Sequence, residues 1–217
     1  MTLSLVIGNK NYSSWSLRPW IAMKVAGIPF QEQVIPLYEA DSPRKIRELS
    51  PAGKVPILID DDIRVWESLA IIEYLADKFP DAKLWPTEVR GRAHARVLAA
   101  EMHAGFSNLR RHCPMNVRRP VKPRELTPEV LQDVKRIEEM WNDSRAHFGK
   151  NGPFLCGAFG AVDAMYAPIV SRFHTYKIEV GATARTYMDA VMALPAWADW
   201  AAAARSEAWV LPHCEVD

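Results

Sequence analysis

The sequence predicts an α/β domain followed by an all-helical domain. Residues 1–80 alternate between strand-like and helix-like segments, whereas the rest of the chain shows helical patterns only. A proline-bounded segment from Pro80 to Pro86 interrupts both kinds of pattern. We therefore expect two domains, residues 1–80 and 87–217, joined by a linker over residues 81–86.

The first part of the α/β domain predicts two strands and two helices in alternation. The segments are Leu3–Ile7, Tyr12 to about Ala26, Phe30–Val34 and Ser42 to about Leu49. Pro19 suits the first helix if it lies in the first turn, where its missing N–H costs little. The alternation of apolar and polar residues in Phe30–Val34 is typical of a half-buried strand.

The stretch from Ser50 to Phe79 predicts a strand, a turn, a strand and a helix. Val55–Ile59 and Ile63–Trp66 are apolar runs separated by three aspartates, which favours an antiparallel hairpin. From Ser68 onward, apolar residues recur every three or four positions, as in an amphipathic helix. The resulting order, β-α-β-α-β-β-α, is that of a thioredoxin-type domain.

Beyond residue 86, caps and apolar spacing predict only helices. We expect them over Thr87 to about Arg111, from Thr127 past Trp141, and over Ala161–Tyr176, Thr183–Ala193 and Ala196–Ala204. The strongly apolar composition of Ala161–Tyr176 predicts that this helix lies at the centre of the domain.

Charge and cysteine content exclude several classes of function. The formal net charge of +1 gives no reason to expect nucleic acid or an anionic membrane as a partner. No apolar run is long enough to span a bilayer, and we expect no secretory leader. The three cysteines are far apart and the six histidines lack metal-ligand spacing. We therefore expect a cytoplasmic protein without a metal site.

Two details of the stretch from Ser50 to Phe79 suggest a binding site. Pro56 removes a ladder donor from a buried strand; if the Val55–Pro56 bond is cis, the backbone of Val55 can pair with a peptide-like ligand. Glu67 and Ser68 stand where a helix begins, and an anion there meets free N–H groups. Each detail also has an ordinary explanation, a proline opening a strand and a serine cap.

Basic residues cluster between the first two helices of the second domain. They are Arg110, Arg111, His112, Arg118, Arg119, Lys122 and Arg124, with Glu125 as the one acidic residue among them. The cluster is either a solvated loop or, if it faces a cleft, a surface that favours a negatively charged co-substrate.

Three motifs together resemble the cytosolic glutathione transferase family over essentially the whole chain. They are Ser50-Pro51-Ala52-Gly53-Lys54-Val55-Pro56, Glu67 to Leu75, and Gly160-Ala161-Val162-Asp163. The last resembles the family's buried capping motif, in which Ser or Thr usually stands where this chain has Gly160. Asp163 remains to accept backbone N–H bonds.

The loop from Ser13 to Arg18 resembles the Ser-Ser-x-Ser-x-Arg pattern of the serine-type, zeta-like members. Those members isomerise maleylacetoacetate or conjugate small α-halo acids. A cysteine is common at the position of Trp15, so this departure counts against that isomerase activity. The absence of cysteine from the loop argues against the omega-like members, which form mixed disulfides with glutathione.

The resemblance implies that glutathione binds as a co-substrate. Val55 would pair with its cysteinyl backbone, Glu67 with its ammonium, and Ser68 with the neighbouring carboxylate. Lys54 would meet the glycyl carboxylate. The residues expected to contact glutathione are Tyr12, Trp15, Lys54, Val55, Pro56, Glu67 and Ser68.

The thiolate of glutathione would be the nucleophile, and a hydroxyl at the start of the first helix lowers the thiol pKa by hydrogen bonding. Ser13 and Ser14 both fit this role, one of them being expected to cap the helix, and Tyr12 is a third candidate. The electrophile pocket is expected between the domains, lined by His103, Phe106, Ser107, Arg110, Arg111, Phe173 and Tyr176.

These expectations together describe a glutathione transferase, or a zeta-like isomerase, acting on a small acidic electrophile in detoxification. Resemblance also implies a homodimer. The alternative is a non-catalytic binding or regulatory protein on the same scaffold, since fold does not determine function. A glutathione-dependent disulfide reductase or peroxidase is less favoured, because the loop has no cysteine.

Overall fold

The N-terminal part of the computed structural model, which describes residues 3–217, contains a four-stranded mixed sheet. Its strands are β1 (Leu3–Ile7), β2 (Phe30–Val34), β3 (Ile57–Asp60) and β4 (Ile63–Trp66), in the order β2-β1-β3-β4. Strand β1 is parallel to β2 and antiparallel to β3, and β3 and β4 form the expected hairpin. The predicted β-α-β-α-β-β-α order is confirmed.

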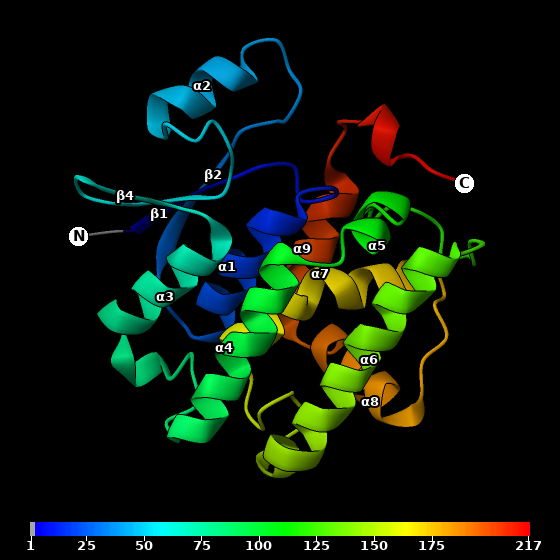
Figure 1. Ribbon diagram of the computed structural model, residues 1–217. Helices are drawn as coiled ribbons and strands as arrows, with labels where there is room; N and C mark the ends of the chain where they lie inside the picture. The colour runs from blue at the N-terminus through cyan, green and yellow to red at the C-terminus, as the bar shows by residue number, and fades with distance from the viewer. Residues whose placement is uncertain (1–2) are drawn as a thin grey trace.

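Helices cover both faces of this sheet, as Figure 1 shows. They are α1 (Ser14–Val25), α2 (Ser42–Leu49) and α3 (Ser68–Lys78). Because side chains alternate along a strand, Leu5 and Ile7 join the core under α1 and α3, whereas Val6 packs with Ile46 of α2. The apolar run of β1 is therefore explained by burial on both sides.

The C-terminal part consists of helices and connecting loops, with one isolated β-bridge between Phe154 and Gly157 in the described residues. Its helices are α4 (Val89–Ala104), α5 (Ser107–His112), α6 (Pro128–Phe148), α7 (Ala161–Thr175), α8 (Ala182–Met192) and α9 (Pro195–Ser206), and single 3₁₀ turns occur at Pro80–Ala82, Gly149–Asn151 and Pro212–Cys214. Helix α7 is buried over nearly its whole length and contacts α1, α4 and α8. Its predicted central place is confirmed.

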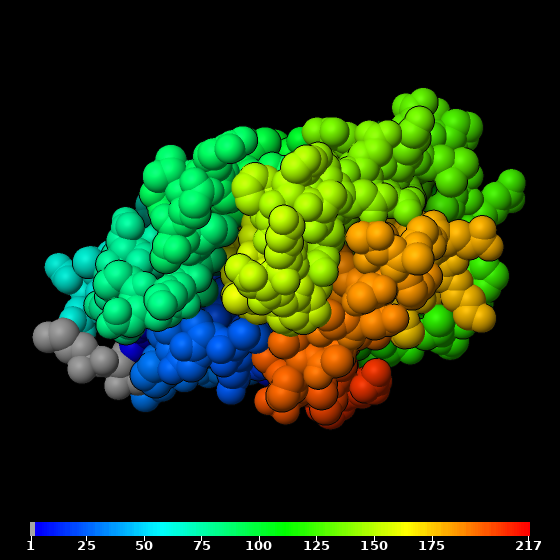
Figure 2. All heavy atoms as spheres, turned by 90° about the horizontal axis from the view of Figure 1, so that it is seen from below, coloured from blue at the N-terminus to red at the C-terminus, as the bar shows by residue number. Residues whose placement is uncertain are grey.

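The two parts share one continuous apolar core. Side chains of β1, α1 and α3 belong to the same buried cluster as those of α4, α6, α7 and α9. In Figure 2, which views the molecule from below, the blue segment that includes α1 lies beside the orange C-terminal helices, in line with the contacts between α1 and α9. The boundaries 1–80, 81–86 and 87–217 stay predictions.

The prediction of one helix from Thr87 to Arg111 is wrong. Helix α4 ends at Ala104 because the backbone of Gly105 is extended rather than helical. A Cβ on Gly105 would lie 2.8 Å from the carbonyl oxygen of Glu101. Phe106 then adopts a left-handed conformation, with φ of 58°, before α5 begins. The break redirects α5 and its arginines.

Two further expectations about the first domain need correction. Pro19 lies in the second turn of α1 rather than the first. Strand β2 is mostly exposed rather than half-buried, because it is the edge strand of the sheet.

Close packing explains why Gly160 stands at the start of α7. A Cβ at this position would lie 2.8 Å from the carbonyl oxygen of Leu84, which accepts a hydrogen bond from the N–H of Ala161 at 2.7 Å. Asp163 supplies the remaining cap, since its carboxylate accepts the N–H groups of Gly160 at 2.9 Å and Leu155 at 3.0 Å. Over residues 3–217, no helix has the length and apolar composition needed to cross a membrane.

Candidate functional site

The turn that precedes β3 leaves a backbone segment available for binding. The peptide bond between Val55 and Pro56 is cis, and β3 begins only at Ile57. Within the described chain, neither the N–H nor the C=O of Val55 has a hydrogen-bond partner. Free backbone groups beside a sheet can pair with an extended peptide.

Helix α3 begins beside this turn with Glu67 and Ser68. Glu67 has φ of 67°, a left-handed conformation that a residue with a side chain adopts at some energetic cost. Its carboxylate is half exposed, whereas Ser68 is buried and its hydroxyl accepts a hydrogen bond from Nη1 of Arg18 at 3.5 Å. The carboxylate suits a cationic group, and the helix start suits an anion.

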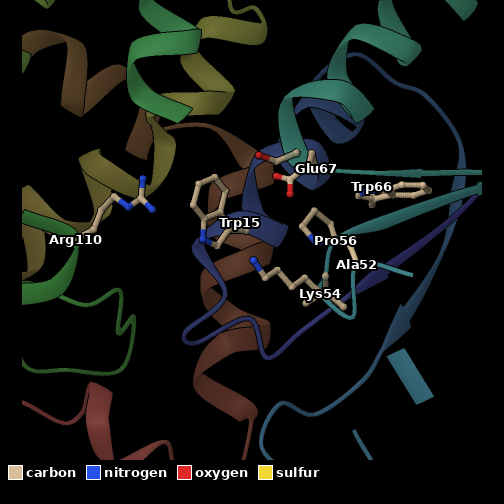
Figure 3. Close-up of a pocket in the computed structure, with 9 residues that line it drawn as sticks. Trp15, Ala52, Lys54, Pro56, Trp66, Glu67 and Arg110 are labelled. Carbon is tan, nitrogen blue, oxygen red and sulfur yellow. The ribbon is translucent and has the colours of Figure 1, made fainter. Parts of the chain in front are cut away.

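These groups line a pocket of about 290 Å³. Its lining residues are Trp15, Ala52, Lys54, Val55, Pro56, Trp66, Glu67, Ser68 and Arg110. Figure 3 shows Trp15 between Arg110 on one side and Lys54, Pro56 and Glu67 on the other. A carboxylate, cations and free backbone groups in one pocket match a small zwitterionic peptide.

Two guanidinium groups lie over the ring of Trp15. The guanidinium carbon of Arg18 lies 4.0 Å from the centroid of the indole, and that of Arg110 lies 4.6 Å from it. Burial and the neighbouring charge of Arg110 lower the pKa of Arg18. Burial also lowers the pKa of Arg110. Trp15 therefore contacts one cation that lines the pocket, Arg110, and one buried cation that does not, Arg18.

His103 of α4 connects the helical domain to this wall. Its ring meets Trp15 edge to face at 5.3 Å, and its Nε2 lies 3.5 Å from Oε2 of Glu67. Burial and the charge of Arg18 lower the pKa of His103, which favours its neutral form. His103 thus borders the Glu67 carboxylate without lining the pocket itself.

The two candidate serines differ in their contacts. Ser13 is buried and caps α1: its Oγ accepts from the N–H of Ser16 at 3.4 Å and donates to Oγ of Ser16 at 2.7 Å. Ser14 is the first residue of α1 and is partly exposed. Its hydroxyl has no hydrogen-bond partner anywhere in residues 3–217, so it is free to donate to a ligand.

A second, larger pocket of about 750 Å³ adjoins the first. Both pockets are lined by Trp15, Lys54, Val55 and Arg110. Ser13 and Ser14 line the larger one, as do Tyr12, Leu37, Tyr38, Ser42, Pro43, Ile46, Gly53, Arg111, Pro114, Met115, Arg172, Leu211, His213 and Cys214. These lining residues include four Lys or Arg side chains and no Asp or Glu. The pocket therefore favours a negatively charged ligand.

Arg172 is a buried cation in the wall of the larger pocket. Its Nε donates to the carbonyl of Cys113 at 2.8 Å and its Nη1 to that of Pro168 at 3.1 Å. Within residues 3–217, its Nη2 donates no hydrogen bond and no carboxylate forms an ion pair with it. Burial and the charge of Arg110 lower the pKa of Arg172 to about 10.

The hydroxyl of Tyr12 is already occupied. It donates to the carboxylate of Glu215 and accepts from Nη2 of Arg118 at 2.9 Å. Tyr12 borders the larger pocket with a hydroxyl that is committed to the C-terminal segment, unlike that of Ser14. Of the three candidate hydroxyls, the structure leaves Ser14 free.

Five of the seven residues expected in the electrophile pocket line neither pocket: His103, described above, and four others. Phe106 and Phe173 are buried in the core, and Phe173 packs against Trp141 with ring centroids 5.5 Å apart. Tyr176 is buried, and its hydroxyl donates to the carbonyl of Pro114 at 2.8 Å. Ser107 is exposed at the start of α5. None of the four lines either pocket.

The basic cluster predicted from the sequence divides between two roles. Arg110 and Arg111 line the larger pocket. Arg118 and Arg119 instead donate to backbone carbonyls, including those of Glu207 and Val216 near the C-terminus. The cluster is therefore partly a pocket wall and partly a structural anchor.

Three residues of the site were given no role by the sequence analysis. Arg18 stands in the serine motif, and Arg172 is a basic residue in an otherwise apolar helix, a signal that could have identified it. Glu207 accepts hydrogen bonds from the N–H groups of Lys10 and Asn11. No local pattern could have identified Glu207, because the contact joins opposite ends of the chain.

Comparisons with known proteins agree with this geometry. Family models of the glutathione S-transferase N-terminal and C-terminal domains match residues 12–78 and 124–203. A probable maleylacetoacetate isomerase of Caenorhabditis elegans is 36% identical over 97 residues, 45% of each chain. A dichloromethane dehalogenase of Methylophilus leisingeri is 27% identical over 139 residues, 60% of this chain and 51% of that one. The chain thus spans about half the length of these curated relatives.

Two solved structures share the fold over nearly their whole length. A Burkholderia glutathione transferase homolog with bound glutathione has a TM-score of 0.74 at 20% identity, covering 95% of this chain and 100% of that one. A maleylpyruvate isomerase, a bacterial zeta-class protein, has a TM-score of 0.71 at 19% identity, covering 94% of this chain and 99% of that one. With both domain models matched in the predicted order, the chain belongs to the glutathione S-transferase family.

Proposed function

We propose that the protein activates the thiol of glutathione for attack on a small acidic electrophile, in a conjugation or an isomerisation. The observation that carries this proposal is that the peptide-sized pocket and the basic pocket share Trp15, Lys54, Val55 and Arg110. A thiol held at Val55 would face the second pocket directly. The names of the relatives, an isomerase and a dehalogenase, support the same class of reaction.

Each part of glutathione has a partner in the smaller pocket. The free N–H and C=O of Val55 pair with the cysteinyl residue, as one strand pairs with another. Glu67 accepts from the γ-glutamyl ammonium, and Ser68 at the start of α3 binds the neighbouring carboxylate. Lys54 is the cation available to the glycyl carboxylate.

The chemistry requires the thiolate, which a hydroxyl donor stabilises. In this proposal the thiol proton leaves to solvent, and the free hydroxyl of Ser14 donates to the sulfur while Ser13 caps the helix. The sulfur electron pair then forms a C–S bond. In conjugation a halide departs with its bonding pair; in isomerisation the thiolate adds to the substrate and is expelled after bond rotation.

The second pocket accounts for an acidic electrophile. Buried charges in proteins are normally paired, yet Arg172 has no carboxylate partner in the described part of the chain. A substrate carboxylate bound at its free Nη2 would supply the missing partner. Arg110 and Arg111 add to the same positive field.

Serine variants test the thiol step. The ultraviolet absorbance of the thiolate, measured against pH, gives the pKa of the bound glutathione thiol. Turnover is measured in parallel with a chloro-acid and with an aryl halide. Loss of one charge-assisted hydrogen bond in Ser14→Ala should raise that pKa by about 1 to 2. Ser13→Ala should chiefly lower the free energy of unfolding, by about 1 kcal/mol. Unchanged rates in the double variant would refute thiol activation by these serines.

Calorimetry separates the enzyme from its non-catalytic alternative. An enzyme of this kind must bind glutathione before it can use the thiol, so we expect saturable binding of glutathione alone. Absence of binding at millimolar glutathione would favour a binding or regulatory protein on the same scaffold.

A further inference from the structure

The loop that carries the two serines, residues 8–14 (the serine loop), is held by the far end of the chain. Oε1 of Glu207 accepts the N–H of Lys10 at 2.6 Å, and Oε2 accepts the N–H of Asn11 at 3.0 Å. Glu207 directly follows α9 and is partly buried. Bonds from N–H groups to a carboxylate are stronger than bonds between neutral groups, so this pair fixes the loop firmly.

Other groups of the helical domain bind the opposite side of the same two residues. The indole N–H of Trp200 donates to the carbonyl of Lys10 at 3.0 Å, and the N–H of Val117 donates to the carbonyl of Asn11 at 3.2 Å. The backbone N–H and C=O of both loop residues are therefore held from outside the sheet domain. The loop would stay attached without Glu207, but with two donors released.

A tight turn connects Lys10 and Asn11 to the two serines. The carbonyl of Asn9 accepts the N–H groups of Tyr12 at 3.2 Å and Ser13 at 2.8 Å, which closes a tight turn around Lys10 and Asn11. Helix α1 begins at Ser14, immediately after that turn. A shift of Lys10 and Asn11 therefore moves the hydroxyls at the start of the helix.

We propose that Glu207 is a positioning residue for thiol activation: by fixing Lys10 and Asn11, it sets where the hydroxyls of Ser13 and Ser14 lie relative to the glutathione sulfur. This inference rests on the function proposed above. Misplacing a reacting group by about 1 Å can cost about 100-fold in rate, so a remote contact that fixes the loop affects turnover.

Three substitutions weaken the contact between Glu207 and the serine loop to different degrees. Glu207→Asp keeps a carboxylate on a shorter side chain, Glu207→Gln replaces one acceptor oxygen with an amide NH₂, and Glu207→Ala removes both acceptors. The matched control is Glu179→Gln, an exposed carboxylate that has no hydrogen bond or ion pair among residues 3–217. The Asp and Gln variants keep the test informative if the Ala variant fails to fold.

The readouts are kcat, the Kd of glutathione, the thiol pKa and amide exchange. For Glu207→Ala we expect kcat to fall about 10- to 100-fold, as is typical for residues that orient a reacting group. The Kd of glutathione should stay within about twofold, because Val55, Glu67 and Ser68 are untouched. The thiol pKa should rise, and the amides of Lys10 and Asn11 should exchange faster. Glu207→Asp should recover part of kcat.

Two results would overturn the inference. One is a Glu207→Ala variant with faster exchange at Lys10 and Asn11 but an unchanged thiol pKa and kcat. The other is a fall in thermal stability alone. The double variant of Ser13 and Ser14 separates the two proposals: if it raises the thiol pKa while Glu207→Ala does not, thiol activation stands and the positioning role fails. If it changes nothing, thiol activation itself fails.

Discussion

The guanidinium carbon of Arg18 lies 4.0 Å from the centroid of the Trp15 indole. Arg110 contacts the same ring at 4.6 Å. Within residues 3–217, neither guanidinium forms an ion pair. The π electrons of one ring therefore stabilise two like charges, of which Arg110 lines the pocket and Arg18 is buried.

Replacing Trp15 by Ala should lower both stability and glutathione affinity. Each cation–π contact contributes about 0.5 to 2 kcal/mol, and removing the ring leaves two neighbouring like charges without it. Trp15→Phe retains an aromatic face and should lose less. Urea denaturation and calorimetry with glutathione measure both effects. Equal losses in the two variants would show that ring size, rather than the stacked charges, matters.

Replacing Glu67 by Gly should weaken glutathione binding while raising stability. The left-handed backbone at φ of 67° suits Gly, and relief of its strain should add about 1 kcal/mol to the free energy of unfolding. Loss of the carboxylate removes the partner of the ligand ammonium. Glu67→Gln is the control, with weaker binding and unchanged stability. A Gly variant that binds glutathione normally would contradict the role of the carboxylate.

Replacing Arg172 by Met should act selectively on acidic electrophiles. Loss of a hydrogen bond from a charged group costs about 1.5 to 3 kcal/mol, so KM for a chloro-acid should rise about 10- to 100-fold. KM for glutathione and for a neutral aryl halide should change little. Arg205→Met, at an exposed position, is the matched control. An equal rise for the neutral substrate would point to a general packing defect.

The buried carboxyl group of Asp163 should make the stability of the protein depend on pH. Burial raises its pKa to about 7, although the N–H groups of Leu155 and Gly160 act in the opposite direction. The folded protein therefore binds this proton more tightly than the unfolded chain does, whose carboxyl titrates near pH 4. The contribution of this proton to the free energy of unfolding is fully present below about pH 4. It is lost as the pH rises to about 7, and the free energy of unfolding falls by up to roughly 1.4 kcal/mol per pH unit.

The matched variant for this effect is Asp163→Asn, which cannot titrate. Urea denaturation of both proteins between pH 5 and 8 isolates the group, because other titrations cancel in the difference. The stability of the wild type relative to the variant should fall as the pH rises. A difference that stays constant, or grows with pH, would contradict a raised pKa.

The fold was predictable where local patterns decide structure. The β3–β4 hairpin follows from apolar runs around Asp60–Asp62, and α7 follows from a long apolar segment. The break after α4 was not predictable from periodicity, because it depends on how closely Gly105 approaches Glu101. The exposure of β2 likewise depends on the order of the strands in the sheet, and the residues of β2 alone do not determine that order.

The site was predictable where its groups belong to short motifs. Val55, Glu67 and Ser68 lie together around one pocket, as their positions next to a strand and a helix suggested. Phe173 and Tyr176 were expected in the second pocket, but the helix turns them into the core. The sequence could not tell which serine has a free hydroxyl, because this depends on a side-chain contact: the hydroxyl of Ser13 is hydrogen-bonded to that of Ser16.

The anchoring of Lys10 and Asn11 by Trp200 and Glu207 has a consequence for synthesis of the protein. The sheet domain emerges from the ribosome first and carries Val55, Glu67 and Ser68, yet Trp200 and Glu207 emerge nearly two hundred residues after Lys10 and Asn11. A nascent chain that stops short of α9 would keep the contact of Val117 with Asn11 but would lack those of Trp200 and Glu207. If Glu207 positions the serines as proposed, full turnover would require translation beyond residue 207.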